Sequence, residues 1–240
     1  MKIILIGHGK MGRLLEETAL AAGDDIVGIY DDTNLSLLAE RTEPADVVID
    51  FSSHSALPII VDYVRRTGTA LLSGTTGYND EEKALLFSAG ETAPVLWSAN
   101  FSLGIAVLAK ALRLVSGALR PDFDIELTET HHNKKADAPS GTAKLLIEAL
   151  DPKHELTPVY GREGFTGART PSEIGVHALR GGTVAGTHTV HYFGPDEELE
   201  FTHRASSRQI FVNGALKAAR LLVREPRGVT TLDQLLFRQP

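Results

Sequence analysis

Cysteine is absent from all 240 residues of the chain. Its absence excludes disulfide bonds, zinc sites built on thiolates, iron–sulfur clusters and a cysteine nucleophile, because each of these needs a thiol. Four classes of site are therefore ruled out before any motif is considered.

Long apolar runs are also missing. No stretch approaches the ~20 apolar residues of a membrane-spanning helix, and the opening MKIILIG runs into glycines rather than into the longer apolar stretch of a secretory leader. The 24 Lys and Arg against 31 Asp and Glu give a net charge of −7 and a pI near 5.7, which argues against a general nucleic-acid binder. We expect a cytoplasmic globular protein that binds neither membrane nor nucleic acid, with one large domain or two small ones.

The first hundred residues alternate short apolar strands with helical stretches. Strands are expected at 2–6, 25–30, 45–50, 69–72 and 93–97, and helices at about 11–22, 55–66 and 80–89. Strands without in/out alternation, separated by helices, indicate a parallel sheet that is covered on both faces. This half is expected to be α/β, with a Rossmann-type doubly wound parallel sheet.

A different pattern follows a helix expected at 103–116. Apolar and polar residues alternate over 122–130, 174–180, 183–193 and 198–203, with Gly181-Gly182 and Gly194-Pro195 as expected hairpin turns. This alternation predicts a second, α+β domain with an open mixed or antiparallel sheet. We expect a long mobile loop at 152–170 and a helix at 209–223 that packs back on the first domain. The predicted domains are 1–101 with 213–240, and 102–212.

Residues Gly7 to Gly12 read Gly-His-Gly-Lys-Met-Gly, a G-x-G-x-x-G directly after a strand and at the start of a helix. Gly7 permits a tight turn, Gly9 lets the backbone approach a pyrophosphate, and Gly12 allows close packing of helix on strand. The N–H groups and positive dipole end of the helix favour a phosphate there. We expect dinucleotide binding, and the alternative is a tight turn that binds nothing.

An acidic pair follows the second predicted strand. Asp31 comes 19 residues after Gly12, where a carboxylate can accept hydrogen bonds from the adenosine ribose. Asp32 follows it, and the next basic residue is Arg41. Two carboxylates without a nearby cation would repel the 2′-phosphate of NADP, so we expect NADH to be preferred over NADPH. The alternative is a solvated acidic turn.

Two small-residue loops complete this half of the chain. Gly74-Thr75-Thr76-Gly77 follows the fourth strand, and Ser98-Ala99-Asn100-Phe101 follows the fifth. Open α/β sheets bind their ligands at the carboxyl ends of their strands, so both loops are placed to contact a nicotinamide ribose and ring. Each loop by itself would also satisfy ordinary turn chemistry.

The most informative loop runs from Glu129 to Thr142 and reads ETHHNKKADAPSGT. It follows an alternating strand and precedes a helix expected at 141–150. Two adjacent histidines and two lysines concentrate positive charge in a chain of net charge −7, and an anionic substrate is the simplest reason. Ser140-Gly141-Thr142 at the helix start would offer backbone N–H groups to a carboxylate.

Three other interpretations apply to the residue types in this loop. A metal site is disfavoured because adjacent histidines rarely both reach one ion, and His188 and His191, three apart on a strand, point to opposite faces. A nucleophilic Ser140 lacks the sharp G-x-S-x-G turn. The third interpretation, a charged loop that is simply solvated and binds nothing, stays open. The turn that begins at Arg180 could supplement an anion site or be a plain turn.

Residues 131–142 resemble the bacterial dihydrodipicolinate reductase family, whose pattern H-H-x-x-K-x-D-A-P-S-G-T they fit without a gap. The strings GHGKMG, GTTG, ANFS and THRASSR at 202–208 extend the resemblance over nearly the whole chain. The chain departs from the family in two places. Its glycine turn is one residue shorter than G-x-x-G-x-M-G, and its connection from Asp31 to Ala45 is short.

The resemblance implies a reductase of lysine and diaminopimelate biosynthesis. Such an enzyme passes a hydride from NADH or NADPH to a cyclic imine dicarboxylate and gives tetrahydrodipicolinate, without a metal. By resemblance His131 is the acid/base residue and Lys135 the proton donor, while His132 and the backbone N–H groups of Gly141 and Thr142 bind substrate. The cofactor residues that it implies are Gly7, His8, Gly9, Lys10, Met11, Gly12, Asp31, Gly74, Thr75, Thr76, Ser98, Ala99, Asn100 and Phe101.

The resemblance also implies a homotetramer assembled through the second sheet, whose exposed edges would pair with a copy of itself. Residues 1–101 and 213–240 would then bind the dinucleotide, and residues 102–212 would bind substrate and form the oligomer. Two other functions stay open. Another NAD-dependent amino-acid-type dehydrogenase would not need the HHNKK–PSGT loop, and a non-catalytic dinucleotide sensor would have no use for Lys135.

Overall fold

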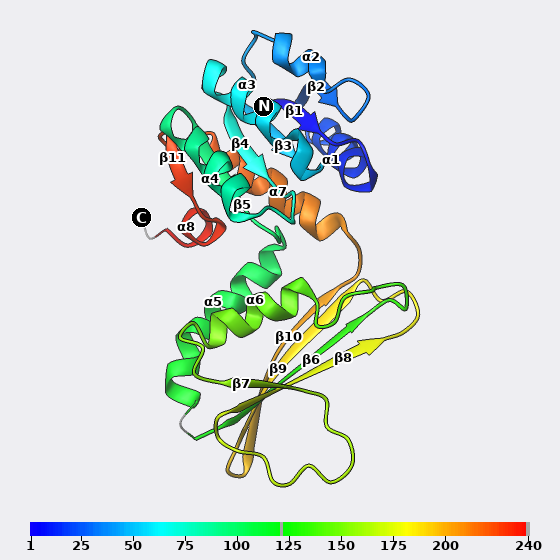
Figure 1. Ribbon diagram of the computed structural model, residues 1–240, viewed down its shortest axis with the longest axis vertical. Coiled ribbons are helices and arrows are strands. Elements are labelled where there is room, and N and C mark those ends of the chain that lie inside the picture. The colour runs from blue at the N-terminus through cyan, green and yellow to red at the C-terminus, as the bar shows by residue number, and fades with distance from the viewer. Residues whose placement is uncertain (121, 239–240) are drawn as a thin grey trace. The chain divides into compact units, whose positions relative to one another are not determined.

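The computed structural model describes residues 1–120 and 122–238, and the chain forms two compact units. Unit 1 contains Met1–Ser102 and the residues from Gln209 onward, and unit 2 contains Leu103–Arg208 (Figure 1). The return to unit 1 comes at Gln209 because helix α7 begins there, slightly before the expected residue 213. Among the described residues no helix is both long and apolar enough to cross a membrane.

Unit 1 is built on a six-stranded sheet in the order β11-β5-β4-β3-β1-β2, in which every neighbouring pair is parallel. Its strands are β1 Lys2–Ile6, β2 Asp25–Tyr30, β3 Val47–Asp50, β4 Ala70–Ser73, β5 Pro94–Trp97 and β11 Gly228–Thr230. The strand order changes direction between β1 and β3, which is where doubly wound sheets bind ligands. The predicted doubly wound α/β sheet is confirmed, and β11 adds an edge strand that the sequence did not reveal.

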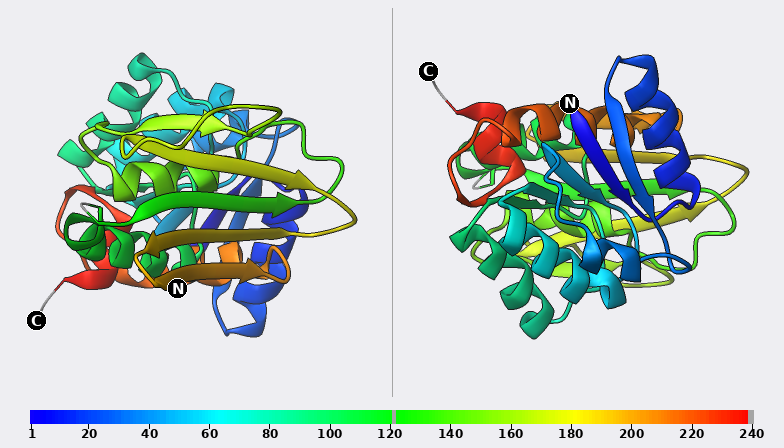
Figure 2. Two further views of the ribbon diagram at one scale, coloured as in Figure 1. Left: turned by 90° about the horizontal axis from the view of Figure 1, so that it is seen from below. Right: turned by 90° about the horizontal axis from the view of Figure 1, so that it is seen from above.

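Helices cover both faces of this sheet (Figure 2, right). They are α1 Lys10–Ala21, α2 Ser36–Glu40, α3 Leu57–Thr67, α4 Asp80–Ser88, α7 Gln209–Leu222 and α8 Leu232–Phe237. Alternate strand residues such as Ile4 and Val48 pack with α3 and α4, and the intervening Leu5 and Ile49 are equally buried. Burial on both faces explains why these strands lack any alternation of apolar and polar residues.

Unit 2 has a five-stranded mixed sheet in the order β10-β9-β6-β8-β7. Its strands are β6 Asp124–His131, β7 Thr157–Tyr160, β8 Glu173–Arg180, β9 Gly186–Gly194 and β10 Glu197–Ala205. Strand β6 is the middle strand of this order. It runs antiparallel to β9 on one side and parallel to β8 on the other. The open mixed sheet expected from the sequence is therefore confirmed.

The two helices of unit 2, α5 Leu103–Leu119 and α6 Gly141–Leu150, contact each other and cover one face of the sheet. Leu127 and Val190 point into this core, while Thr128 and Thr189, next along the strands, lie on the other face. That second face carries no helix among the described residues, and Figure 2 (left) views it directly. The alternation in the sequence follows from this one-sided cover.

Two expectations about unit 2 were wrong. Gly181-Gly182 is not a hairpin turn, because β6 lies between β8 and β9, so the connecting residues 181–185 cross the end of β6. The expected loop at 152–170 contains strand β7, which pairs with β8 at the sheet edge. Its Pro158 obscured the strand in the sequence, although an edge strand tolerates a residue that lacks an N–H donor.

Candidate active-site residues

The glycine turn lies at the end of β1, next to the point where the strand order changes direction. Gly7 has a left-handed φ of +89°, and a side chain there would lie 2.4 Å from the carbonyl oxygen of Phe51. A side chain at Gly12 would lie 1.9 Å from the carbonyl oxygen of Gly7. Both positions therefore need glycine for packing within unit 1, as the sequence indicates.

Gly9 is different, because nothing lies within 4 Å of the position its Cβ would take. It is the N-cap residue of α1, and no side chain among the described residues caps the helix there. An uncapped helix start beside open space offers N–H donors and a positive dipole end to an anion. The start of α1 is thus open to an anionic group, because the packing of unit 1 does not fill the space beside Gly9.

The acidic pair begins where β2 ends. Asp31 Oδ1 accepts hydrogen bonds from the side chain and backbone N–H of Thr33, at 2.6 and 2.9 Å, and these lower the pKa of Asp31. The guanidinium of Arg41 is committed elsewhere, since it donates to the carbonyl oxygens of Val27 and Glu43. His8, in the glycine turn, contacts Glu16 with 2.7 Å between His8 Nε2 and Glu16 Oε2.

The loops after β3 and β4 are joined through a buried carboxylate that the sequence analysis did not single out. Asp50, fully buried, accepts hydrogen bonds from the hydroxyls of Ser52 at 2.5 Å, Ser73 at 2.7 Å and Tyr78 at 3.3 Å. Burial raises the pKa of Tyr78 to about 12, and the charge of Asp50 adds to the shift. The phenol therefore stays protonated and able to donate.

The predicted cofactor loops 74–76 and 98–101 also come together. Trp97 Nε1 donates to the carbonyl oxygen of Thr75 at 2.8 Å. The buried ring of Phe101 lies 5.8 Å from the ring of Phe51, which in turn packs against Gly74. Ser98 Oγ donates to the carbonyl oxygen of Asn100 at 2.8 Å and fixes the last loop. Both loops thus lie at the carboxyl edge of the sheet, where their positions in the sequence placed them.

In unit 2, Glu129 is the centre of the predicted basic loop. Its fully buried carboxylate lies 2.5 Å from Nδ1 of His131 and accepts a hydrogen bond from the backbone N–H of Ser140 at 3.0 Å. Arg180 donates to both carboxylate oxygens, at 2.8 and 2.9 Å. Burial acts to raise the pKa of Glu129, but the hydrogen bonds from Arg180, His131 and Ser140 outweigh it and lower the pKa. The carboxylate is therefore ionised.

Ser140 and His188 form a buried pair beside His131. Ser140 Oγ lies 3.0 Å from His188 Nε2 and accepts the N–H of Ala143, so it caps helix α6. His188 packs edge-on against the ring of His131, and burial, together with the charge of His131, lowers the pKa of His188 to about 4. The neutral His188 and the buried serine make a structural cap rather than an exposed nucleophile, in agreement with the sequence analysis.

The rest of the basic loop surrounds this centre. Lys135 Nζ lies 2.9 Å from Asp137 Oδ1, and the backbone N–H of Lys135 donates to the carbonyl oxygen of His132. Among the described residues, Nδ1 of His132 is buried without a hydrogen-bond partner. Gly141 begins α6 with open space at its Cα, and Thr142 follows in the first helical turn.

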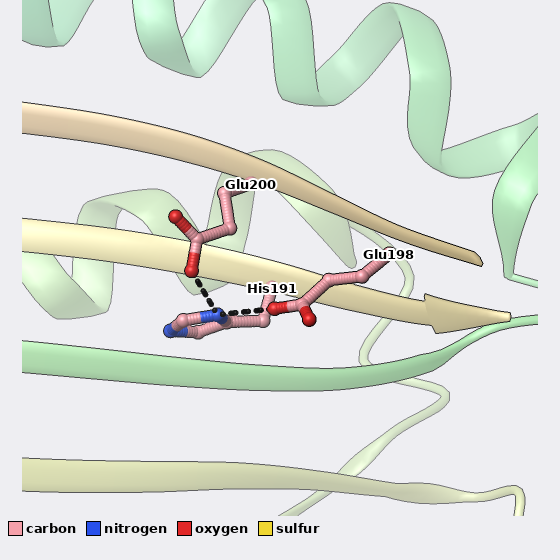
Figure 3. A group of neighbouring side chains, drawn as sticks. All are labelled: His191, Glu198 and Glu200. Atoms are coloured by element: carbon pink, nitrogen blue, oxygen red, sulfur yellow. Dashed lines mark hydrogen bonds and ion pairs between the residues drawn. The ribbon is translucent and has the colours of Figure 1, made fainter.

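One further cluster has the residue types of a cation site. His191, Glu198 and Glu200 lie on the uncovered face of the sheet, with His191 Nδ1 at 3.4 Å from Glu198 Oε1 and 3.0 Å from Glu200 Oε1 (Figure 3). The sequence did not reveal it, because pairing of β9 with β10 brings the three residues together. His188 lies on the opposite, buried face, as expected from its spacing to His191. The distances are those of ordinary ion pairs.

Sequence reasoning gave no role in this site to Glu129, His188 or Asp50, and it considered Arg180 only as the start of a turn that could supplement an anion site. In the strand pairing Glu129 faces His188, and His131 faces Arg180. No local motif connects these positions. The nearest signal was the strict alternation of β6, which places Glu129 on the apolar face where a carboxylate is unusual.

Comparisons with known proteins agree along the whole chain. The family profile described as dihydrodipicolinate reductase, N-terminus, matches residues 1–101, and the one described as dihydrodipicolinate reductase, C-terminus, matches residues 104–236. A 4-hydroxy-tetrahydrodipicolinate reductase from an Exiguobacterium species is 42% identical over 98% of this chain and 95% of its own length. A protein of the same name from Staphylococcus aureus is 41% identical over 98% of this chain and all of its own.

Solved structures show the same fold. A dipicolinate-bound dihydrodipicolinate reductase from Paenisporosarcina sp. TG-14 has a TM-score of 0.78 at 20% identity, over 98% of this chain and 99% of that one. An amine dehydrogenase from Mycobacterium smegmatis, with a TM-score of 0.57 at 12% identity, covers 97% of this chain and 95% of its own. The fold is therefore shared with other dehydrogenases, and the identification rests on the sequence relatives. The chain belongs to the dihydrodipicolinate reductase family of NAD(P)H-dependent oxidoreductases.

Proposed function

We propose that this chain reduces the dihydrodipicolinate ring to tetrahydrodipicolinate, with the cofactor on unit 1 and the substrate dianion on unit 2. The observation that carries the proposal is that the carboxylate of Glu129 contacts two groups, the imidazole of His131 and the backbone N–H of Ser140. One carboxylate thereby ties an acid/base group to the N-terminus of α6. A helix N-terminus is a favourable place for a substrate carboxylate.

Unit 1 supplies the dinucleotide site. Bound NADH or NADPH would supply the hydride. The pyrophosphate would lie on the uncapped start of α1 near Gly9, and Asp31 would accept hydrogen bonds from the adenosine ribose. The residues assigned to the cofactor are Gly7, His8, Gly9, Lys10, Met11, Gly12, Asp31, Gly74, Thr75, Thr76, Ser98, Ala99, Asn100 and Phe101. The ionised Asp31 and the engaged Arg41 favour NADH over NADPH.

Unit 2 supplies the protons and the anion site. His131 would act as acid/base group, and Lys135 would give the proton that completes reduction after hydride addition. His132 and the N–H groups of Gly141 and Thr142 would bind the substrate. Lys135 is paired with Asp137. A substrate carboxylate would compete for this ammonium group, which can serve both as counter-ion and as acid.

We further propose a homotetramer that assembles through the uncovered face of the unit 2 sheet. Thr128, Thr189 and Thr202 line this face beside charged side chains, so a second copy could satisfy it with hydrogen bonds. Sedimentation velocity should then give a mass of about 104 kDa, four times the 25.9 kDa of the chain. A monomer at working concentration would contradict this assembly. We place the reaction in the cytoplasm, where reduced nicotinamide is available.

The test is an assay of NADH consumption at 340 nm with freshly prepared dihydrodipicolinate. Lys135→Ala and His131→Ala should each lower kcat by about 100-fold or more, the usual weight of one acid/base group. NADH binding, followed by fluorescence, should persist in both variants because neither residue belongs to unit 1. Lys134→Ala is the matched control, since this neighbouring lysine is exposed.

The outcomes of this assay distinguish the proposed function from its alternatives. Normal turnover by Lys135→Ala would remove its assigned role. A wild-type protein that binds NADH and leaves dihydrodipicolinate untouched would support a different dehydrogenase or a sensor. Reduction of an amino-acid-derived imine in its place would identify the dehydrogenase alternative.

A further inference from the structure

The carboxylate of Glu129 receives hydrogen bonds from three different segments of unit 2. One oxygen, Oε2, contacts His131 Nδ1 at 2.5 Å and Arg180 Nη1 at 2.8 Å. The other, Oε1, accepts the backbone N–H of Ser140 at 3.0 Å and Arg180 Nη2 at 2.9 Å. All four lone-pair directions of the carboxylate are therefore used, and no water is needed to satisfy it. Such complete satisfaction is what a buried charge requires.

The contact with His131 determines which ring nitrogen is free to exchange a proton. An ionised carboxylate can only accept, so Nδ1 of His131 must carry a hydrogen. The lone pair of the neutral ring then lies on Nε2, and this nitrogen gains or gives the proton. Gly186 faces Nε2, where the Cβ of any other residue would lie 3.1 Å from it. The backbone at Gly186 thus leaves Nε2 free of a side chain on that side.

The contact with Ser140 extends the influence of Glu129 to the start of α6. Ser140 is the N-cap residue of this helix, and its neighbours Gly141 and Thr142 are the proposed carboxylate binders. The same carboxylate group thus holds the acid/base ring and the anion-binding turn. Arg180 fixes the carboxylate in turn, and its Nη2 also donates to the carbonyl oxygen of Asp137 at 2.6 Å.

We propose that Glu129 is a positioning residue for the reduction. It selects the tautomer of His131 with the proton on Nδ1, and it fixes the distance between that ring and the first turn of α6. Arg180 serves as its counter-charge and keeps it ionised. This inference rests on the proposed function, because it takes His131 as the acid/base group of that reaction.

Other charged groups near the pair do not offer a competing explanation. The groups that face Glu129 and His131 are Arg180 from β8, His188 from β9, and Lys135 and Asp137 from the loop after β6. His188 is a neutral neighbour with its Nε2 turned to Ser140. Lys135 is paired with Asp137 at 2.9 Å. Glu129 is therefore the carboxylate that the ring of His131 contacts.

The first test is a double-mutant cycle between Glu129→Gln and His131→Ala. An amide places a donor at one of the two oxygens, so it cannot accept from all the present partners. Glu129→Gln alone should lower kcat with dihydrodipicolinate by roughly 10- to 100-fold and leave the KM for NADH within about twofold. In the His131→Ala background, the same change should lower kcat by less than about threefold.

A purely structural role predicts the same loss of kcat in both backgrounds, and that result would overturn the proposal. Full activity of Glu129→Gln in the wild-type background would also overturn it. Glu126→Gln is the matched control, because Glu126 lies on the same strand and also binds guanidinium groups, but on the opposite face. It should leave kcat unchanged.

A second measurement reads the tautomer of His131 directly. It needs only one variant, which assigns the signal. Nitrogen-15 NMR of histidine-labelled wild-type protein reports the tautomer of each ring, and His131→Ala identifies the His131 resonances. A proton on Nδ1 of neutral His131 supports the proposal, and a proton on Nε2 overturns it, even if Glu129→Gln fails to fold. This readout does not depend on turnover, so inactivity of the wild type with dihydrodipicolinate would count against the proposed function alone.

Discussion

The rings of His131 and His188 meet edge to face, with centroids 5.1 Å apart and ring planes at 75°. His131 is 8% accessible, whereas His188 is 3% accessible and its pKa is lowered to about 4 by burial and by the charge of His131. His188 therefore acts as a neutral support, and its titration bears on stability rather than on catalysis.

Acid should destabilise the protein through His188. The unfolded chain binds a proton at this residue near pH 6.5, whereas the folded chain does so only near pH 4, so the unfolded state holds more protons between these values. The free energy of unfolding should fall as the pH drops from about 6.5 to about 4, by up to about 3 kcal/mol from this residue. Urea unfolding at several pH values measures the slope.

His188→Gln should flatten that slope whatever it does to stability at pH 7. His154→Gln, which changes an exposed histidine, should leave the slope unchanged. An unaltered slope in His188→Gln would show that another group is responsible.

Two glycine substitutions in unit 2 should act in opposite directions. A Cβ at Gly175 would lie 1.7 Å from Glu126 Oε2, so Gly175→Ala must displace a carboxylate that binds Arg162 and His177. We expect a loss of about 1 kcal/mol, because the flexible end of Glu126 can turn aside only by weakening these partly exposed ion pairs. Gly117, exposed in α5, has nothing within 4 Å, so Gly117→Ala should add about 0.5–1 kcal/mol of helix stability. Thermal unfolding of both variants measures the contrast, and a stable Gly175→Ala would contradict the packing at Glu126.

Two glycines in the glycine turn of unit 1 allow a second comparison of substitutions. Gly12→Ala would place a Cβ 1.9 Å from the carbonyl oxygen of Gly7 and should cost about 3 kcal/mol or more of folding stability. Gly9→Ala meets nothing within 4 Å and should fold normally. It should weaken NADH binding roughly tenfold or more, because a methyl group would stand where we propose that the pyrophosphate binds. Tight NADH binding by a folded Gly9→Ala variant would show that the cofactor does not bind at Gly9.

The choice between NADH and NADPH should depend on Asp31. Its Oδ1 is engaged by Thr33, so Oδ2 is the oxygen that would accept from the ribose hydroxyls under the proposed cofactor assignment. Asp31→Ser should lower kcat/KM for NADH by roughly tenfold and raise the relative use of NADPH, since it removes a charge-assisted acceptor and a repulsive carboxylate. Asp25→Asn, at the other end of β2, serves as control. A wild-type preference for NADPH would contradict the assignment of Asp31.

Local patterns in the sequence predicted much of the fold. The parallel sheet of unit 1, the helix at 141–150 and the mixed sheet of unit 2 follow from sequence periodicity, and the burial patterns of β3, β4 and β6 reproduce that periodicity. The glycine turn was also predicted with its reasons, since Gly7 and Gly12 are needed for packing and Gly9 is not. These features depend on residues that are close in the chain.

The environment of His131 could not be predicted in this way. Glu129, Arg180 and His188 meet because β6 lies between β8 and β9, an order that no turn signal in the sequence specifies. The glycines after Arg180 suggested a hairpin, which would have moved Arg180 away from β6. Register across a sheet depends on the whole pattern of pairing, so the partners of a buried carboxylate appear only once the strand order is known.

The connection between β8 and β9 has a consequence for how this protein can vary. Its backbone bonds to the segment that carries the adjacent histidines: Gly181 donates to the carbonyl oxygen of His131, and Val184 accepts from the N–H of His132. Insertions or deletions in this short crossing would therefore move the backbone that carries both imidazoles. The length of this crossing is accordingly expected to be constrained by the two histidines that it supports as well as by the strands that it joins.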